Sequence, residues 1–153
     1  MATQSTMERK VLIIEDSPAD ARMIRIAIER RDPTIETEVL EDGALAMRYF
    51  SLYRDDGEIP PCDLILLDLN LPRVSGFEIL EFLKKDSELM KIPVVVLSGS
   101  SSNEDIERSY AAGANSYLCK PTGIDEVFDM AVQLVSYWFE HVRLPGKLSV
   151  PAW

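Results

Sequence analysis

Basic side chains are scarce in this sequence. Its 153 residues include 16 Lys and Arg against 26 Asp and Glu, which gives a formal net charge of -10 at pH 7. No block of basic residues is present that could neutralise several phosphates of a nucleic acid. The composition therefore predicts no direct binding to DNA or RNA.

Long apolar runs and cysteines are also few. The N-terminal stretch MATQSTMERK precedes only the short run VLII, which cannot serve as a signal-peptide core or a membrane span. The two cysteines, Cys62 and Cys119, lack metal-ligand spacing, and free thiols suit a reducing cytosol. We expect a cytoplasmic protein without a membrane segment, with both cysteines buried or half-buried near strand ends.

Three apolar runs are continuous rather than alternating. Val11–Ile14, Leu64–Leu67 and Val94–Leu97 are rich in Val, Ile and Leu, which is typical of strands covered on both faces of a parallel sheet. The segments Ile35–Leu40 and Asn115–Cys119 are predicted as two further strands.

Segments with helical spacing separate these runs. The expected helices run from about Pro18 to Asp32, onward from Gly43, over Gly76–Lys85, over Asn103–Ala112 and over Ile124–Glu140. A βα unit repeated five times predicts an α/β fold with a doubly wound parallel sheet and right-handed crossovers.

Polar side chains follow four of the predicted strands. Glu15 and Asp16 come after the first strand, Asp68 after the third, Ser98 after the fourth and Lys120 after the fifth. In a doubly wound sheet the carboxyl ends of the strands form the ligand-binding edge. These five residues are therefore predicted to meet at one site.

Three carboxylates at one edge repel one another unless a cation lies among them. Oxygen ligands at a solvent-open edge suit Mg²⁺, which takes one or two carboxylates and keeps several waters. We predict Asp16 and Asp68 as direct ligands and Glu15 as a ligand through water. The backbone carbonyl of Asn70 is the simplest further oxygen.

A carboxylate beside Mg²⁺ can attack phosphorus and form an acyl phosphate. Asp68 is the predicted phosphoacceptor, Lys120 offers a positive charge to a phosphoryl oxygen, and the Ser98 hydroxyl offers a hydrogen bond to another.

Five separated motifs occur in a characteristic order. They are Glu15-Asp16, the run DLNLP at Asp68–Pro72 with Ser75-Gly76 after it, Ser98, Tyr117 and Lys120-Pro121. This set resembles the receiver domains of two-component response regulators, from Lys10 to Tyr137. The departures are Glu15, where aspartate is commoner, Ser98, where threonine is commoner, and Ser75, which replaces Asp or Asn.

The resemblance implies a flavodoxin-like strand order of 2-1-3-4-5 with five helices. It also implies that Asp68 takes a phosphoryl group from a phosphohistidine of a sensor histidine kinase. Ser98 and Tyr117 would then form a switch that alters the face made by the fourth helix, fifth strand and fifth helix. The peptide bond before Pro121 would be cis, as is usual in the family.

The chain divides into a flexible N-terminus (1–9), a receiver domain (10–140) and an extension (141–153) that is too short for an output domain. Apolar residues cover a much wider arc of the last helix than the stripe of about 100° that packing on a sheet needs. We therefore expect Phe139, Val132 or Tyr137 to stay exposed in a monomer. A homodimer through this helix and the fifth strand would cover them, with the segment Leu144–Trp153 crossing or bracing the contact.

A narrower resemblance concerns the partner kinase. The polar loop before Cys62, the run DLILLDLNLPRVSG and the extension SYWFEHVRLP are similar to the stand-alone regulators of bacterial phytochrome kinases, which are typically homodimeric.

Two alternatives use the same site. A phosphorelay intermediate would pass its phosphoryl group to a histidine phosphotransfer protein, and the sequence does not separate it from a terminal switch. An aspartyl phosphatase usually needs a second aspartate two residues after the nucleophile, where this chain has Asn70. We therefore expect a regulator that catalyses only its own phosphorylation and dephosphorylation.

Overall fold

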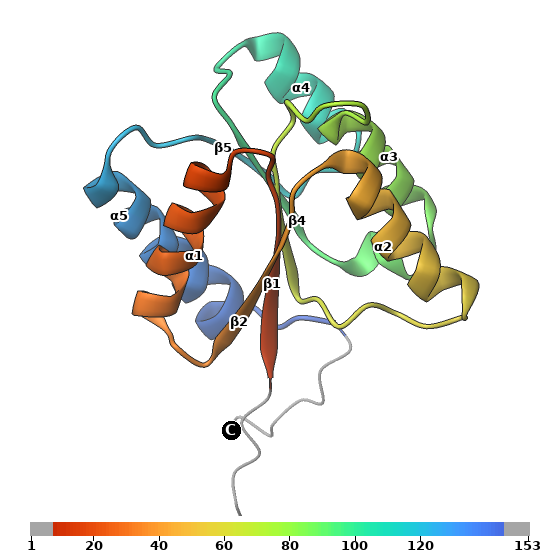
Figure 1. The fold of residues 1–153 in the computed structure, drawn as a ribbon, viewed down its shortest axis with the longest axis horizontal. Coiled ribbons are helices and arrows are strands. Elements are labelled where there is room, and N and C mark those ends of the chain that lie inside the picture. The colour runs from red at the N-terminus through yellow and green to blue at the C-terminus, as the bar shows by residue number, and fades with distance from the viewer. Residues whose placement is uncertain (1–7, 146–153) are drawn as a thin grey trace, which may run out of the picture.

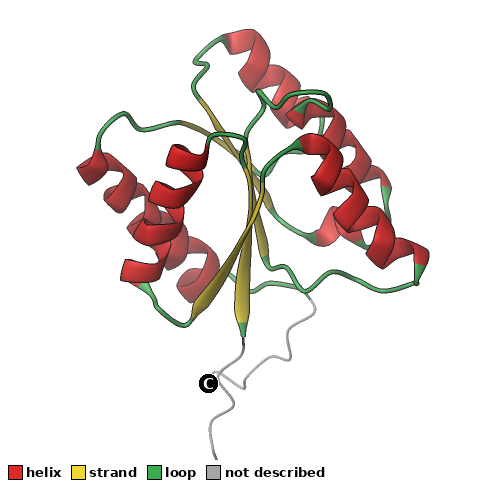
Figure 2. Cartoon of the chain, viewed as in Figure 1, coloured by secondary structure: helices red, strands yellow, loops and turns green. Residues whose placement is uncertain are grey.

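The computed structural model describes residues 8–145 and contains a five-stranded parallel sheet between two layers of helices (Figures 1 and 2). The strand order is β2-β1-β3-β4-β5. The predicted doubly wound fold and its order of 2-1-3-4-5 are confirmed.

The strands lie close to their predicted positions. Three begin or end one residue or more from the expected boundary: β1 starts at Arg9, β4 continues to Ser98 and β5 starts at Ser116. The strands are β1 (Arg9–Ile14), β2 (Ile35–Leu40), β3 (Leu64–Leu67), β4 (Val94–Ser98) and β5 (Ser116–Cys119).

Each helix begins at a recognisable signal in the sequence. Ser17, Asp42, Ser75 and Ser102 accept a backbone N–H with their side chains and so cap the first four α-helices. The helices are α1 (Pro18–Arg31), α2 (Gly43–Asp55), α3 (Gly76–Lys85), η1 (Leu89–Lys91), α4 (Asn103–Ala111), α5 (Ile124–Val135) and η2 (Ser136–His141). Within residues 8–145, none of them could cross a lipid bilayer.

The two faces of the sheet have separate cores. Side chains such as Leu12, Ile65 and Val96 point to the face covered by α2 and α3, with Phe50 and Leu80. Alternate side chains of the same strands point to the face covered by α1 and α5 (Figure 1). Because both faces are covered, the stretches Val11–Ile14, Leu64–Leu67 and Val94–Leu97 of the central strands are apolar at every position.

The last helix changes its geometry at its end. After Val135 it continues as the π-helix η2. The predicted exposure of Val132 and Tyr137 is confirmed. The prediction is wrong for Phe139, because this ring is only 6% exposed and packs in the core between the sheet, α1 and α5. A π-turn holds more residues than an α-turn, so the 100° spacing used for the sequence no longer applies there.

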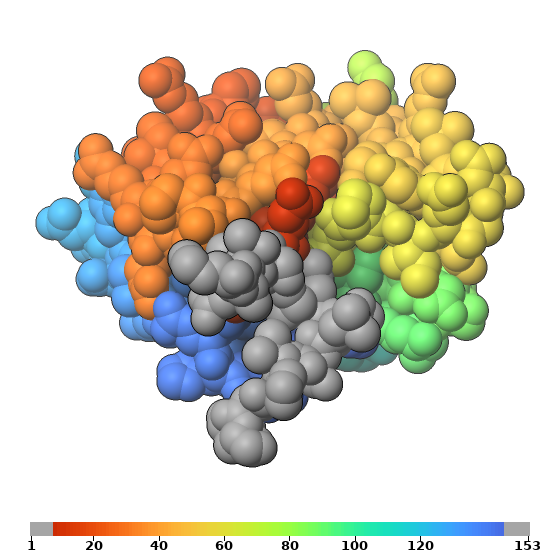
Figure 3. Space-filling model, turned by 90° about the horizontal axis from the view of Figure 1, so that it is seen from below, coloured from red at the N-terminus to blue at the C-terminus, as the bar shows by residue number. Residues whose placement is uncertain are grey.

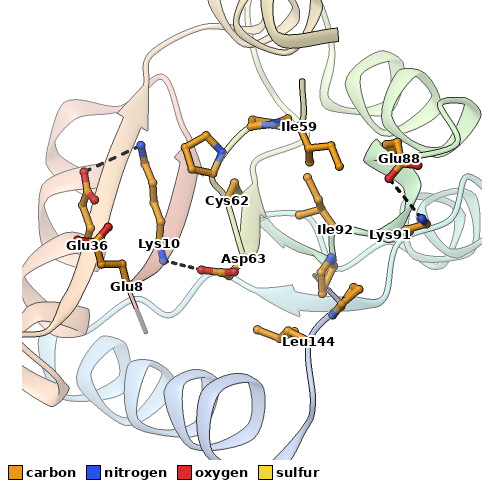
Figure 4. Close-up of a pocket in the computed structure, with 14 residues that line it drawn as sticks. Glu8, Lys10, Glu36, Ile59, Cys62, Asp63, Glu88, Lys91, Ile92 and Leu144 are labelled. Carbon is orange, nitrogen blue, oxygen red and sulfur yellow. Dashed lines mark hydrogen bonds and ion pairs between the residues drawn. The ribbon is translucent and has the colours of Figure 1, made fainter. Parts of the chain in front are cut away.

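A groove of about 600 Å³ lies at the amino edge of the sheet, where the strands begin. Figure 3 looks onto this edge, and Figure 4 shows Ile59, Ile92 and Leu144 along the groove, with Lys10 and Asp63 beside them. Leu144 also packs against the α1/α5 core. The predicted role of Leu144–Trp153 in a dimer falls mostly on residues 146–153, which lie outside the described part.

The two cysteines differ from each other. Both thiols are free, as the sequence predicts, and Cys62 is half-buried. Cys119 is exposed, so the prediction of burial is wrong for this residue. It ends β5, which among residues 8–145 is an edge strand paired with β4 alone.

Candidate functional site

The carboxyl edge of the sheet gathers three acidic side chains. Carboxylate oxygens of Glu15, Asp16 and Asp68 lie within 4.8 Å of one another. Asp16 is exposed, whereas Glu15 is 3% and Asp68 5% exposed. Charged groups buried to this degree need partners.

Lys120 supplies the balancing charge. Its Nζ is 3.2 Å from Asp68 Oδ2 and 3.1 Å from Asp20 Oδ2, and it also contacts Glu15 Oε1. Burial alone would lower the pKa of Lys120, but its hydrogen bonds to Glu15 and Asp20 and the charge of Asp68 raise it overall. The ammonium therefore stays charged and holds the carboxylates together.

Glu15 titrates far from its ordinary range. Burial is the main cause, and a hydrogen bond with Asp68 and the Asp68 charge add to it, so the pKa of Glu15 rises to about 7 despite the opposing effect of Lys120. Repulsion between two carboxylates this close makes it unfavourable for both to be ionised at once. The same proximity favours a cation among them.

The peptide bond before Pro121 differs from the family's usual geometry. No cis peptide bond occurs anywhere in residues 8–145, so the expected cis bond is wrong here. Lys120 nevertheless reaches the acidic side chains. The backbone N–H of Lys120 donates to the carbonyl of Ser98 at 2.8 Å, which fixes the lysine beside the end of β4.

The backbone fixes Asp68 on both sides. Its N–H donates to the Ile14 carbonyl at 3.0 Å, and the N–H of Asn70 donates to Asp68 Oδ1 at 3.1 Å. The start of α3 packs directly on this turn, because a Cβ at Gly76 would lie 2.4 Å from the Asp68 carbonyl oxygen and 2.6 Å from Leu69 Cα. Asn70 therefore lies beside the acidic cluster, while metal ligation by its carbonyl stays a prediction.

Ser98 and Tyr117 are linked through the loop after β4. Ser98 is fully buried, and its Oγ accepts the N–H of Ser100 at 3.1 Å. The half-buried Tyr117 donates its hydroxyl to the Ser100 carbonyl at 2.8 Å. The pair predicted to act as a switch is thus connected through one residue.

Sequence reasoning missed Asp20. This residue lies in the first turn of α1 and forms an ion pair with Lys120. Its place in the acidic run EDSPAD, in the first helical turn after the predicted metal ligands, is a signal that could have found it, because the first turn of a helix stays close to the strand end that precedes it.

Comparison with known families agrees with this geometry. The model of the response regulator receiver domain matches residues 11–132. The chain belongs to this family. Members of this family are regulators rather than classical enzymes. The fold described above is the receiver fold.

Two relatives of the receiver domain cover most of the chain. It is 36% identical over 146 residues to the response regulator Rcp1 of Synechocystis sp., which covers 95% of this chain and 99% of Rcp1. It is 39% identical over 136 residues to the probable methanogenesis regulatory protein FilR2 of Methanothrix harundinacea, with 89% of this chain and 87% of FilR2 covered.

Solved structures show the same receiver fold. The phosphorylated cyanobacterial phytochrome response regulator RcpA matches with a TM-score of 0.83 at 36% identity, over 90% of this chain and 99% of that one. The Mn²⁺-bound form of Rcp1 matches with a TM-score of 0.80 at the same identity and coverage.

Proposed function

We propose that this receiver domain accepts a phosphoryl group on Asp68 from a phosphohistidine of a sensor histidine kinase. The observation that carries the proposal is the buried Asp68 carboxylate, held next to Glu15 and Asp16 and within 3.2 Å of the Lys120 ammonium. A carboxylate so placed is a nucleophile surrounded by the charges that phosphoryl transfer requires.

The transfer exchanges one bond to phosphorus for another. An Asp68 carboxylate oxygen forms the new P–O bond, while the P–N bond to the kinase histidine breaks and its electron pair returns to the ring nitrogen. Lys120 leaves its contacts with the acids and pairs with a phosphoryl oxygen. The Ser98 hydroxyl donates a hydrogen bond to another, because serine can donate while it accepts the Ser100 N–H.

The acidic cluster fits a hard divalent cation. Asp16 and Asp68 would bind Mg²⁺ directly, with Glu15 through water and the carbonyl of Asn70 as a further ligand. Three carboxylates within 4.8 Å support this set, as does the Mn²⁺-bound structure of the relative Rcp1. When bound, the metal supplies positive charge that neutralises the transferring phosphoryl group.

A metal-removal experiment tests the proposed function. Incubation with acetyl phosphate and Mg²⁺ should add one phosphoryl group to the protein, detected by intact-mass analysis. Excess EDTA should abolish the addition, because the acidic cluster then repels the incoming phosphate. Equal labelling with and without EDTA would contradict the metal site, and no labelling with Mg²⁺ would contradict the function.

The relatives also support proposals about the partner kinase and the domain bounds. RcpA, a phytochrome response regulator, shares the fold and 36% identity, which supports a bacterial phytochrome as the kinase. The match to Rcp1 over 99% of that protein supports a receiver domain over 10–140 that acts together with the extension 141–153. Since such kinases use ATP, we place the pair in the cytoplasm. The excess of acidic residues supports protein rather than nucleic-acid partners.

A second copy of this chain is the partner that we propose for the face between β5 and α5. A groove there is lined by Leu118, Met130, Leu134 and Trp138, with Tyr137 54% exposed at its margin. The Tyr137 and Trp138 rings stack edge to face with centroids 5.0 Å apart. An aromatic patch beside an open strand edge is suited to association with a symmetry-related copy.

Light scattering tests this homodimer. The wild type should have the mass of a dimer at tens of micromolar, and Tyr137→Asp should shift the mass toward that of a monomer, because a carboxylate in the contact is desolvated without a partner. Leu52→Asp, a matched change of an exposed residue of α2, should leave the mass unchanged. A monomeric wild type would refute the dimer.

A further inference from the structure

Three carboxylates share the ammonium group of Lys120. Its Nζ is 3.1 Å from Asp20 Oδ2 and 3.2 Å from Asp68 Oδ2, and it also contacts Glu15 Oε1. An ammonium group has three N–H donors, so each carboxylate can accept one of them. A phosphoryl oxygen that binds Lys120 therefore competes with these carboxylates for a donor.

The three contacts differ in how easily water can replace the lysine. The side chains of Glu15 and Asp68 are 3% and 5% exposed, whereas that of Asp20 is 51% exposed. A buried carboxylate that loses its cation is left without solvation, but an exposed one is solvated by water. Asp20 is therefore the carboxylate that Lys120 gives up at the lowest cost.

The start of α1 fixes Asp20 close to the site. The Glu15 carboxylate accepts the N–H of Ser17 at 3.3 Å, and the Ser17 hydroxyl accepts the N–H of Asp20 at 3.3 Å. The N–H of Ala21 donates to the Ser17 carbonyl at 3.0 Å and closes the first helical turn. Because this capped turn follows β1 directly, it holds the Asp20 carboxylate within reach of Lys120 Nζ.

We propose that Asp20 is a positioning residue for Lys120 and competes with the phosphoryl group for the lysine ammonium. The inference rests on the proposed function, because it concerns the cation that would bind the phosphoryl group on Asp68. When Lys120 binds a phosphoryl oxygen, its contact with Asp20 has to break or lengthen, and the free energy of this contact is subtracted from phosphoryl binding. Asp20 thereby lowers the affinity of the site for a phosphoryl group and slows its transfer to Asp68.

Removal of the Asp20 charge should therefore strengthen binding at Asp68. Beryllium trifluoride mimics a phosphoryl group on an aspartate. With saturating Mg²⁺, Asp20→Asn should bind it about twofold to fivefold more tightly than the wild type, which corresponds to the loss of one half-exposed ion pair. Titration calorimetry measures this affinity. A loss of structure would weaken binding, so tighter binding separates the competition from a merely structural role of Asp20.

Asp125→Asn is the matched control. Asp125 is exposed and lies in the first turn of α5, which starts at the same edge of the sheet as α1. Among the described residues, the ion-pair partners of Lys120 are Glu15, Asp20 and Asp68. The control thus removes the same charge from the same kind of position without breaking a contact of Lys120. At physiological ionic strength, which screens exposed charges, its affinity for beryllium trifluoride should equal that of the wild type.

The outcomes distinguish this role of Asp20 from the proposed function. If the wild type does not bind beryllium trifluoride, or Asp68→Asn binds it equally well, the proposed function is overturned. If the wild type binds it and Asp20→Asn has the same or a lower affinity, the competition for Lys120 is overturned. An equal rise in affinity in Asp20→Asn and Asp125→Asn would show an effect of net charge alone and would also overturn the competition.

Discussion

The variant Asp68→Asn should take up no phosphoryl group from acetyl phosphate and Mg²⁺, whereas the wild type should take up one. The amide has nearly the shape of the carboxylate, so the hydrogen bonds of residue 68 with Ile14 and Asn70 can persist. An amide oxygen is, however, a poor nucleophile and forms no stable acyl phosphate. Intact-mass analysis at several times after mixing would measure the loss.

The loss in Asp68→Asn should not come from unfolding. The neutral amide removes the repulsion between Asp68 and Glu15 but also the attraction between Asp68 and Lys120, which keeps its contacts with Glu15 and Asp20, so we expect the free energy of unfolding to change little. Asp55→Asn changes an exposed aspartate at the end of α2 and serves as the matched control, with labelling equal to the wild type. Labelling of Asp68→Asn at the wild-type rate would place the acceptor on another residue.

A single methyl group at Gly76 should damage both the fold and the site. In Gly76→Ala the new Cβ would lie 2.4 Å from the Asp68 carbonyl oxygen and 2.6 Å from Leu69 Cα, and these are backbone atoms that no rotamer can move away. Either α3 or the turn after β3 must shift. We expect the free energy of unfolding to fall by about 2–3 kcal/mol and the labelling rate to fall about tenfold or more.

Gly99→Ala is the control for Gly76→Ala. Gly99 follows Ser98 at the same edge of the sheet, but a Cβ there would meet no atom within 4 Å. Its unfolding in urea and its labelling by acetyl phosphate should therefore match those of the wild type. Equal behaviour of the two alanine variants would show that the close packing of α3 on Asp68 has no influence on the site.

The sheet and the placement of its polar residues follow from the sequence because they rest on local patterns. The runs Val11–Ile14 and Leu64–Leu67 are apolar at every position, and this demands burial on both faces. Once the strands are parallel, the residues that follow them must share an edge, so Asp68 and Lys120 are predictable neighbours.

The parts that the sequence does not predict depend on geometry between elements. Phe139 is buried because the helix widens into a π-turn, and no residue type marks that change. The ion pair between Asp20 and Lys120 joins residues 100 positions apart, and many exposed acids in a first helical turn serve only the helix dipole. The prediction of a cis bond before Pro121 was also wrong, because the backbone path there depends on the whole loop and not on the proline alone.

The contacts of Lys120 separate folding from ion loading. Its ammonium serves as a built-in counterion that Glu15, Asp20 and Asp68 share, so one positive charge of the chain partly offsets the acidic corner. We therefore expect the chain to fold without a bound cation. Binding of a metal ion or a phosphoryl group at this corner can then change the signalling state of the domain without deciding whether the domain is folded.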